Sequence, residues 1–252
     1  AGTHGKTTTA TMLAHILKKA GKRTTAFLGG ISHNYKTNLL LADSGDVLIV
    51  EADEYDRSFL QIHPDIAIIT SVDADHLDIY EDADDLQLAF KQFVSQIKPK
   101  GFLLVEKSIA ADFHIAERLT KLTYSATSGA DYFTENVRVE NGRMIFDMIA
   151  SKEIEKDIEL HMPGIHNVSN AVAASAVACY LGLSFNDVRK GLSTFKGINR
   201  RFDKHIDTER LVFIDDYAHH PEEVSATIDA TKQLYPSREL MVVFQPHLFS
   251  RT

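Results

Sequence analysis

The chain has 252 residues, of which 44% are hydrophobic and 25% charged, enough for a sizeable core in one large domain or one and a half ordinary ones. A formal net charge of −8 argues against a protein that binds nucleic acid or a membrane surface, because both need a basic face. The single cysteine, Cys179, excludes an intrachain disulfide and fits a reduced, cytoplasmic setting.

The first 130 residues alternate between helix and strand patterns. Residues 7–20 place apolar side chains on one helical face, and Gly21 follows as a natural stop. Continuous apolar runs are typical of strands buried on both faces of a parallel sheet. We therefore expect a doubly wound, mostly parallel α/β fold, with helices over 7–20, 84–97 and 109–119 and strands at "RTTAFLGG", "DVLIVEADE", "DIAIITSVDADH" and "GFLLVE".

The pattern changes near residue 131, where polarity alternates around the hairpin signal Asn141-Gly142. This alternation predicts a small antiparallel subsheet over 131–162. Helical spacing then returns over 166–181 and 186–195.

The polar stretch "KGINRR" marks the predicted domain boundary, between residues 197 and 198. After it we expect a strand at "RLVFIDD", a helix over 222–234 and a strand at "ELMVVFQPH". About 50 residues of this kind bury too little surface to fold alone. We interpret 1–197 as one domain and 198–252 as the incomplete start of a second α/β domain.

The opening stretch "AGTHGKTTTATML" has the character of a phosphate cradle. Backbone N–H groups of a glycine-containing turn at a helix N-terminus attract phosphate oxygens. Lys6 would neutralise the β- and γ-phosphates, and the Thr7 hydroxyl would reach Mg²⁺. An ordinary glycine turn into a helix is the alternative. The residues assigned to ATP in this stretch are Gly2, Thr3, His4, Gly5, Lys6, Thr7 and Thr8.

Acidic residues follow the predicted strands, at the edge where open α/β sheets carry their sites. Glu51 ends one apolar run and is a candidate Mg²⁺ ligand, because Mg²⁺ prefers hard oxygen ligands. For Asp53 and Glu54, a solvated loop position is about as probable as a functional one. His76 follows the next strand and is a candidate second metal ligand, with a loop-capping role as the alternative.

Seven motifs occur in the order found in Mur ligases, and the sequence resembles that family over essentially its whole length. The motifs are GTHGKTTT, EADEYDRSF, DADHLDIY, GIHNVSNAVAA, GINRRF, DDYAHHPEE and FQPHLFSRT. Mur ligases have three domains, which bind the UDP part of the substrate, ATP and the incoming amino acid. The resemblance implies that this chain is the central domain plus the beginning of the third, a fragment cut just before the cradle.

The resemblance also implies a reaction, that of the alanine-adding branch of the family. ATP would phosphorylate the carboxylate of UDP-N-acetylmuramic acid, and the amine of L-alanine would attack the acyl phosphate, in peptidoglycan precursor synthesis. The fragment alone is expected to be inactive. Alternatives are the murein-peptide recycling ligase of the same family, a P-loop nucleotide switch or kinase, and a nucleotide-binding module without turnover.

Roles for the cradle and metal residues come from the same resemblance. Lys6 and Thr7 would hold phosphates and the first Mg²⁺, with Lys6 also catalytic. Glu51 would bind that ion, and His76 a second ion on the substrate side. Their two strands are expected to be neighbours or nearly so, which would bring both side chains beside Thr7.

The remaining site residues lie in later motifs. Asn167 and Asn170 resemble family positions near the nucleotide, although Asn167 could instead cap a helix. The other matches are Arg201 (or Arg200) reaching the phosphates, Asp216 and Tyr217 facing the nucleotide, His219 at the reaction centre, and His247 and Arg251 on the amino-acid side, where Arg251 could hold the alanine carboxylate.

Overall fold

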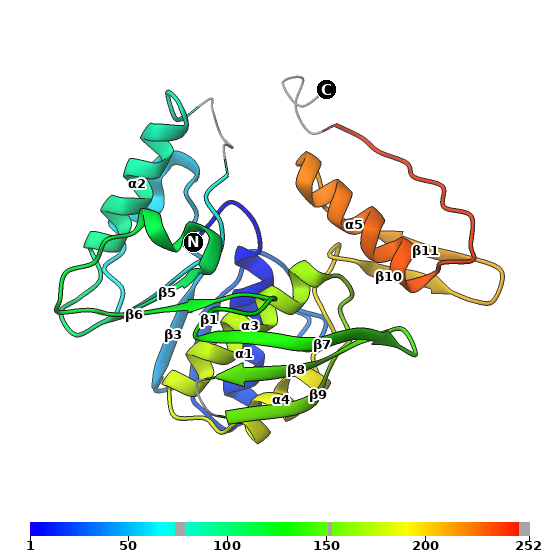
Figure 1. Cartoon of the computed structure of the whole chain (residues 1–252), viewed down its shortest axis with the longest axis horizontal. Coiled ribbons are helices and arrows are strands. Elements are labelled where there is room, and N and C mark those ends of the chain that lie inside the picture. The colour runs from blue at the N-terminus through cyan, green and yellow to red at the C-terminus, as the bar shows by residue number, and fades with distance from the viewer. Residues whose placement is uncertain (74–78, 151–152, 247–252) are drawn as a thin grey trace.

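The structure, a computed structural model, describes residues 1–73, 79–150 and 153–246 (Figure 1). The helices predicted over 7–20, 84–97, 166–181, 186–195 and 222–234 are confirmed, with ends shifted by at most two residues. In these residues the α-helices are α1 (Lys6–Lys19), α2 (Ala83–Ser95), α3 (Ile165–Tyr180), α4 (Phe185–Ser193) and α5 (Pro221–Leu234).

The strands form two larger sheets and a hairpin. The first sheet has the order β2-β1-β3, in which β1 and β3 are parallel. The second has the order β4-β5-β6-β7-β8-β9, parallel from β4 to β7 and antiparallel beyond, so the predicted 131–162 subsheet is one half of it. Their bounds are β1 Thr24–Phe27, β2 Leu39–Leu40, β3 Val47–Val50, β4 Ile66–Ile69, β5 Phe102–Glu106, β6 Thr120–Tyr124, β7 Tyr132–Glu140, β8 Arg143–Ala150 and β9 Glu153–Leu160.

Strand β5 shows why the fold is doubly wound. Successive side chains on a strand point to opposite faces of the sheet. Phe102 and Leu104 belong to the core that contains α1, α3 and α4, whereas Leu103 and Val105 belong to the core beneath α2. Helices therefore cover both faces of the sheet at this strand.

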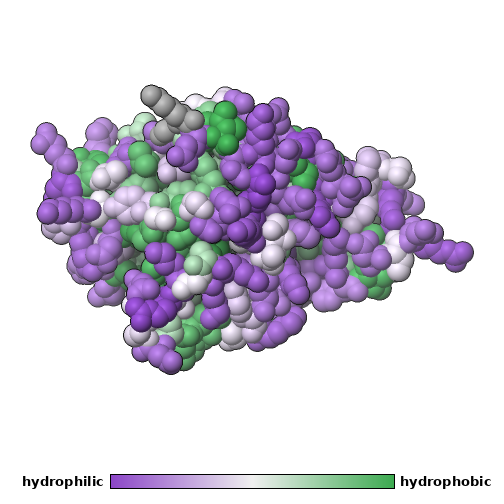
Figure 2. All heavy atoms as spheres, turned by 90° about the horizontal axis from the view of Figure 1, so that it is seen from below, coloured by the Kyte–Doolittle hydropathy of each residue, from purple (hydrophilic) through white to green (hydrophobic). Residues whose placement is uncertain are grey.

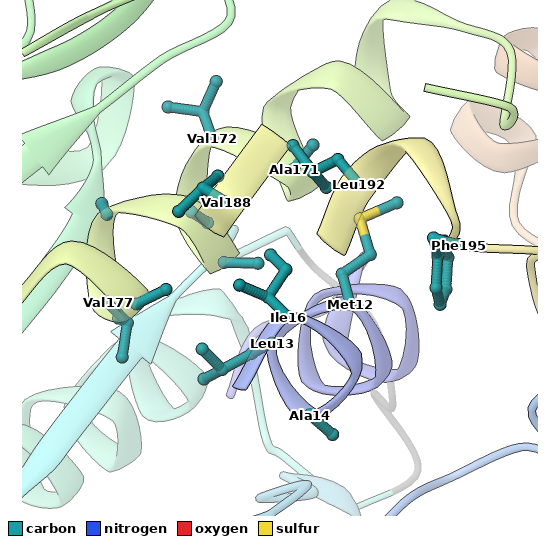
Figure 3. Close-up of a cluster of buried hydrophobic side chains, with 14 of the residues drawn as sticks. Met12, Leu13, Ala14, Ile16, Ala171, Val172, Val177, Val188, Leu192 and Phe195 are labelled. Carbon is teal, nitrogen blue, oxygen red and sulfur yellow. The ribbon is translucent and has the colours of Figure 1, made fainter. Parts of the chain in front are cut away.

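Helix α1, which begins at the cradle, is packed between the sheets and the other helices. Met12 and Ile16 point from α1 toward Ala171 of α3 and Leu192 of α4 (Figure 3). At Gly191 of α4 an added Cβ would lie 2.9 Å from the Cα of Ile16, so the two helices touch almost backbone to backbone. This close packing fixes the position of the cradle.

The prediction that the continuous apolar runs are buried on both faces is wrong for β3, and its neighbour β1 is likewise exposed on one face. Ala26 and Ile49 face the core, but Phe27, Leu48 and Val50 are exposed. The first sheet has α1 on one face only, so the other face of these strands has no covering element among the described residues.

The helix predicted over 109–119 is wrong. This region holds a short 3-10 helix, η2 (Lys107–Asp112), followed by an irregular segment and then β6. The Lys121 ammonium donates hydrogen bonds to the carbonyls of Ala110 and Phe113 at 2.6 and 2.7 Å. Those carbonyls are satisfied by a side chain, and Phe113 is buried against the α2 core.

The C-terminal part forms a smaller unit beside the main body (Figure 1). It consists of β10 (Asp203–Asp207), paired antiparallel with β11 (Val212–Asp215), and of α5. The strand predicted at "ELMVVFQPH" is wrong for the described residues 239–246, where Met241 and Val243 are 85% and 93% exposed. A strand needs a neighbouring strand to hydrogen-bond its backbone N–H and C=O groups, and no described strand pairs with this run.

The molecular surface is mixed in character. The face shown in Figure 2 is dominated by hydrophilic residues, with apolar patches between them. Over the part of the chain that the structure describes, no helix has the length and apolar character needed to cross a membrane.

Candidate active site

The cradle loop runs beside the end of β4. The His4 N–H donates to Ser71 Oγ at 2.9 Å, and the Thr3 N–H donates to the Ser71 carbonyl at 3.3 Å. Thr3 also exchanges hydrogen bonds with the backbone of Asp73 through its hydroxyl, at 3.0 and 3.1 Å. The turn that leads into α1 is therefore fixed from Gly2 to Gly5 before any ligand binds.

Gly5 is the residue at which the loop turns into α1. Its φ is +80°, in the left-handed region, and an added Cβ would lie 2.3 Å from Asn170 Oδ1. Asn170 in turn accepts a hydrogen bond from the Thr9 hydroxyl at 3.2 Å. Both the backbone conformation and the close contact with Asn170 therefore require glycine here.

Thr7 and Glu51 meet at the carboxyl end of β3. The Thr7 hydroxyl donates to Glu51 Oε1 at 2.9 Å, and Glu51 Oε2 accepts the Gly29 N–H at 2.7 Å. A hydroxyl and a carboxylate are hard oxygen donors of the kind that Mg²⁺ prefers, so this pair fits the predicted ion. Among the residues described, no group of three or more His, Cys, Asp and Glu side chains gathers, so phosphate or water oxygens would complete the coordination.

His76 lies outside the described residues, so its predicted role as second ligand is untested. Strands β3 and β4, which precede Glu51 and His76, belong to different sheets and do not pair directly. The cradle residues Ala1 and Thr3 are hydrogen-bonded to the strand and loop around Ile68–Ser71, on the side of β4 away from β5.

Lys6 points to the two acids whose roles the sequence left open. Its Nζ lies 2.6 Å from Glu54 Oε1 and 3.7 Å from Asp53 Oδ1. The Glu54 side chain is 1% exposed and that of Asp53 is 55% exposed. The solvated-loop interpretation is therefore wrong for Glu54 and right for much of the Asp53 carboxylate.

A pocket of about 300 Å³ opens beside the cradle. It is bounded by the cradle, the start of α3, the segment after α4 and the start of α5. Among its lining residues are the predicted site residues His4, Gly5, Thr8, Asn167, Asn170, Arg201 and Asp216.

Asn167 does not cap α3, since the cap position is Gly164 without a side-chain bond. Its amide donates to the Pro163 carbonyl at 2.7 Å and to His166 Nε2 at 3.1 Å. Burial lowers the pKa of His166 to about 4, so the ring is neutral and can accept at Nε2. Asn167 is thus held by the local backbone and lines the pocket.

Asp216 and Arg201 line the pocket on the side of the second unit. Burial raises the pKa of Asp216, although its carboxylate accepts the Phe202 and Ala218 N–H groups at 2.7 and 2.8 Å. The Arg200 and Arg201 guanidinium groups lie over the Tyr217 ring, 5.2 and 5.7 Å from its centroid. Tyr217 is exposed and does not line the pocket.

Glu223, at the start of α5, links the second unit to the cradle. Its Oε1 accepts His4 Nδ1–H at 3.2 Å, its Oε2 accepts the His219 N–H at 3.2 Å, and Arg201 Nη1 lies 3.9 Å away. Burial raises the pKa of Glu223, but the bonds from His4 and His219 and the charge of Arg201 outweigh it and lower the pKa to about 2. The sequence analysis did not single out Glu223 for the site.

His219 lies beside this carboxylate. Its Nδ1 donates to the Tyr217 carbonyl at 2.9 Å and is 3.5 Å from Glu223 Oε2. Because a carbonyl only accepts, Nδ1 is the donor in this hydrogen bond. The predicted substrate residues His247 and Arg251 lie outside the described residues.

Comparison with known proteins defines the class to which this cradle belongs. The family model of the Mur ligase middle domain matches residues 1–178, and that of the Mur ligase, glutamate ligase domain matches residues 200–251. The chain belongs to the Mur ligase family.

Among curated relatives, the UDP-N-acetylmuramate–L-alanine ligase of Parabacteroides distasonis is 47% identical over 252 residues, which are 100% of this chain and 54% of that protein. The chain spans about half the length of the curated relatives it matches. The crystal structure of the UDP-N-acetylmuramate–alanine ligase MurC of Thermotoga maritima matches with a TM-score of 0.82 and 28% identity, over 97% of this chain and 56% of that one. The crystal structure of the UDP-N-acetylmuramate:L-alanyl-γ-D-glutamyl-meso-diaminopimelate ligase (MPL) of Neisseria meningitides matches with a TM-score of 0.68 and 26% identity, over 79% of this chain and 65% of that one.

Proposed function

We propose that this chain carries the ATP site of a ligase that joins L-alanine to the carboxylate of UDP-N-acetylmuramic acid through an acyl phosphate. The observation that carries the proposal is the cradle, in which Lys6 and Thr7 open a buried helix beside Glu51. The relative that is 47% identical over the whole chain is named for this reaction. A carboxylate is a poor electrophile, and phosphorylation supplies the leaving group that the amine displaces.

In this proposal, backbone N–H groups, one lysine and a metal-binding pair have separate roles at the phosphates. The backbone from Gly2 to Thr8 binds phosphate oxygens at the start of α1, and Lys6 neutralises the charge on the transferring phosphoryl group. Thr7 and Glu51 would hold Mg²⁺, which would supply Lewis-acid polarisation of the phosphate oxygens.

Residues around the pocket orient the rest of the nucleotide. Asn167 and Asn170 present amides to the base, and Arg201 reaches the phosphates from the segment after α4. Asp216 orders the loop that carries Tyr217 and His219. His219 Nε2 takes the proton that the attacking amine must lose. His76, His247 and Arg251 keep their predicted roles as second metal ligand and amino-acid contacts.

We further propose two domains, 1–197 and 198–252. The two family models match on either side of this boundary. Among the described residues the hairpin β10–β11 shares no sheet with other strands, and isolated bridges outside the strands pair Ser32 with Ile198 and Ile198 with Arg201. A cytoplasmic setting stays a prediction.

The alternatives are less well supported. The names of the curated relatives favour the alanine-adding reaction over murein-peptide recycling. A switch or kinase would share the cradle but would not need the motifs of the second unit. A nucleotide-binding module without turnover remains to be separated by assay.

The test is a chimera in which these 252 residues replace the matching segment of the Parabacteroides distasonis ligase. The proposal predicts UDP-N-acetylmuramoyl-alanine formation and phosphate release that require ATP, UDP-N-acetylmuramic acid and L-alanine together. ATP binding without product formation would favour the module. The isolated chain should not ligate, because three substrates must be oriented together.

A further inference from the structure

Two glutamates, three residues apart, hold the two successive cradle residues. Glu51 accepts from the Thr7 hydroxyl at 2.9 Å, and Glu54 accepts from the Lys6 ammonium at 2.6 Å. Glu51 is suited to be a metal ligand, whereas Glu54 forms an ion pair with the Lys6 side chain and therefore has a different role. Because its side chain is almost fully buried, the pair with Lys6 is shielded from solvent.

The backbone around Glu54 is held in place by neighbouring elements. The buried Tyr80 hydroxyl donates to the Glu54 carbonyl at 2.6 Å. The Arg57 guanidinium lies 4.8 Å from the centroid of the Tyr80 ring and pairs with Asp85 of α2. This support comes from a segment about 30 residues away in sequence, so the position of Glu54 is set by tertiary structure.

The same loop contains an uncommon backbone conformation. Asp56 and Arg57 both have positive φ, 52° and 60°, in a region that costs a non-glycine residue about 1–2 kcal/mol. Such conformations persist where the surroundings fix them, often beside functional sites. Here they turn the chain so that Glu54 faces Lys6 while Arg57 faces Tyr80.

We propose that Glu54 is a positioning residue for Lys6: it holds the ammonium at the cradle wall and balances its charge. The Lys6 ammonium has three N–H donors, and one of them is already bonded to the Glu54 carboxylate. A nucleotide phosphate must therefore share the ammonium with Glu54. Glu54 thereby weakens the binding of the nucleotide phosphates to Lys6 in the ground state. This loss does not slow a saturated enzyme, because binding energy that is equal in the ground and transition states does not raise kcat. This inference rests on the proposed function, because it takes the nucleotide site as given.

The test is the nucleotide affinity of the 252-residue chain with Glu54→Gln, measured by calorimetry with Mg²⁺ and ATP, ADP or AMP. Glutamine keeps the shape and an oxygen acceptor but removes the charge. The Kd for ATP should fall about tenfold, or ~1.4 kcal/mol. The Kd for AMP should not change, because Lys6 contacts the β- and γ-phosphates. The matched control is Asp53→Asn, which removes the longer and exposed contact and should change each Kd less than about twofold.

A double-mutant cycle with Lys6→Ala separates this role from a structural one. If Glu54 acts through Lys6, the gain in ATP affinity disappears in the Lys6→Ala background. A structural role would weaken all three nucleotides alike and would persist without Lys6. Should Glu54→Gln fail to fold, Glu54→Asp serves instead. Aspartate keeps the negative charge but its shorter side chain holds the carboxylate farther from the Lys6 ammonium, so the Kd for ATP should fall about two- to threefold.

Unchanged or weaker ATP binding by the folded Glu54 variants overturns the inference alone, as does a gain that survives Lys6→Ala. A wild-type chain that binds no nucleotide overturns the proposed function and the inference with it. The two failures are therefore distinguishable in one series of titrations.

Discussion

Replacement of Gly5 by alanine should damage both the fold and the nucleotide site. Alanine at φ +80° costs about 1–2 kcal/mol relative to glycine. Its Cβ would also lie 2.3 Å from Asn170 Oδ1, so Asn170 must move and lose its bond from Thr9, worth about 0.5–1.5 kcal/mol. We expect Gly5→Ala to lower the free energy of unfolding by about 1.5–3.5 kcal/mol in urea titrations.

Gly21 offers a matched control, because its φ is also +80° but no atom lies within 4 Å of an added Cβ. Gly21→Ala should cost only the conformational part, about 1–2 kcal/mol. Asn170→Ala should recover part of the loss in the Gly5→Ala background, since it removes the atom in conflict. If Gly5→Ala is no more destabilising than Gly21→Ala, the contact between the cradle and α3 does not have the importance assigned to it.

Two further predictions concern charge. Lys6→Ala in the chimeric ligase should lower kcat by about 10²-fold or more, because the lysine acts on charge that develops in the transition state, and a raised KM with near-normal kcat would contradict this. Glu223 has a folded pKa of about 2 against an ordinary 4.5, so its stabilisation of up to about 3 kcal/mol is present above pH 4.5 and is lost as the pH falls toward 2. Glu223→Gln should therefore be less stable than wild type at pH 7, and the difference in free energy of unfolding should shrink by more than half at pH 3 in urea titrations, whereas an equal difference at both pH values would rule out this origin.

The parts of the fold that sequence predicted best are governed by local periodicity. Helix α1 shows the 3.6-residue repeat, and the Asn141-Gly142 turn specifies the β7–β8 hairpin. The segment 109–119 was predicted wrongly because its carbonyls bind Lys121, a contact with a later strand. The 239–246 run failed for a similar reason, since a strand depends on a partner and not on its own apolar residues.

The candidate site shows the same division. Lys6, Thr7 and Glu51 could be proposed because a cradle motif and a strand end have recognisable sequence patterns. The role of Glu54 was left open and Glu223 was not proposed, because their partners lie 48 and 219 residues away in the chain. The local sequence around an acidic loop residue is the same whether its side chain is solvated or buried against a lysine, and only tertiary structure distinguishes the two.

The most direct test of the central claim is a calorimetric titration of the 252-residue chain with ATP, with and without Mg²⁺, beside the variant Glu51→Gln. If Thr7 and Glu51 hold the ion and the cradle holds the phosphates, wild type binds ATP at least about tenfold more tightly with Mg²⁺ than without it. Glu51→Gln should lose that Mg²⁺-dependent gain and keep the weaker binding. Absence of ATP binding, or affinity that is the same with and without Mg²⁺ in wild type, would contradict the account.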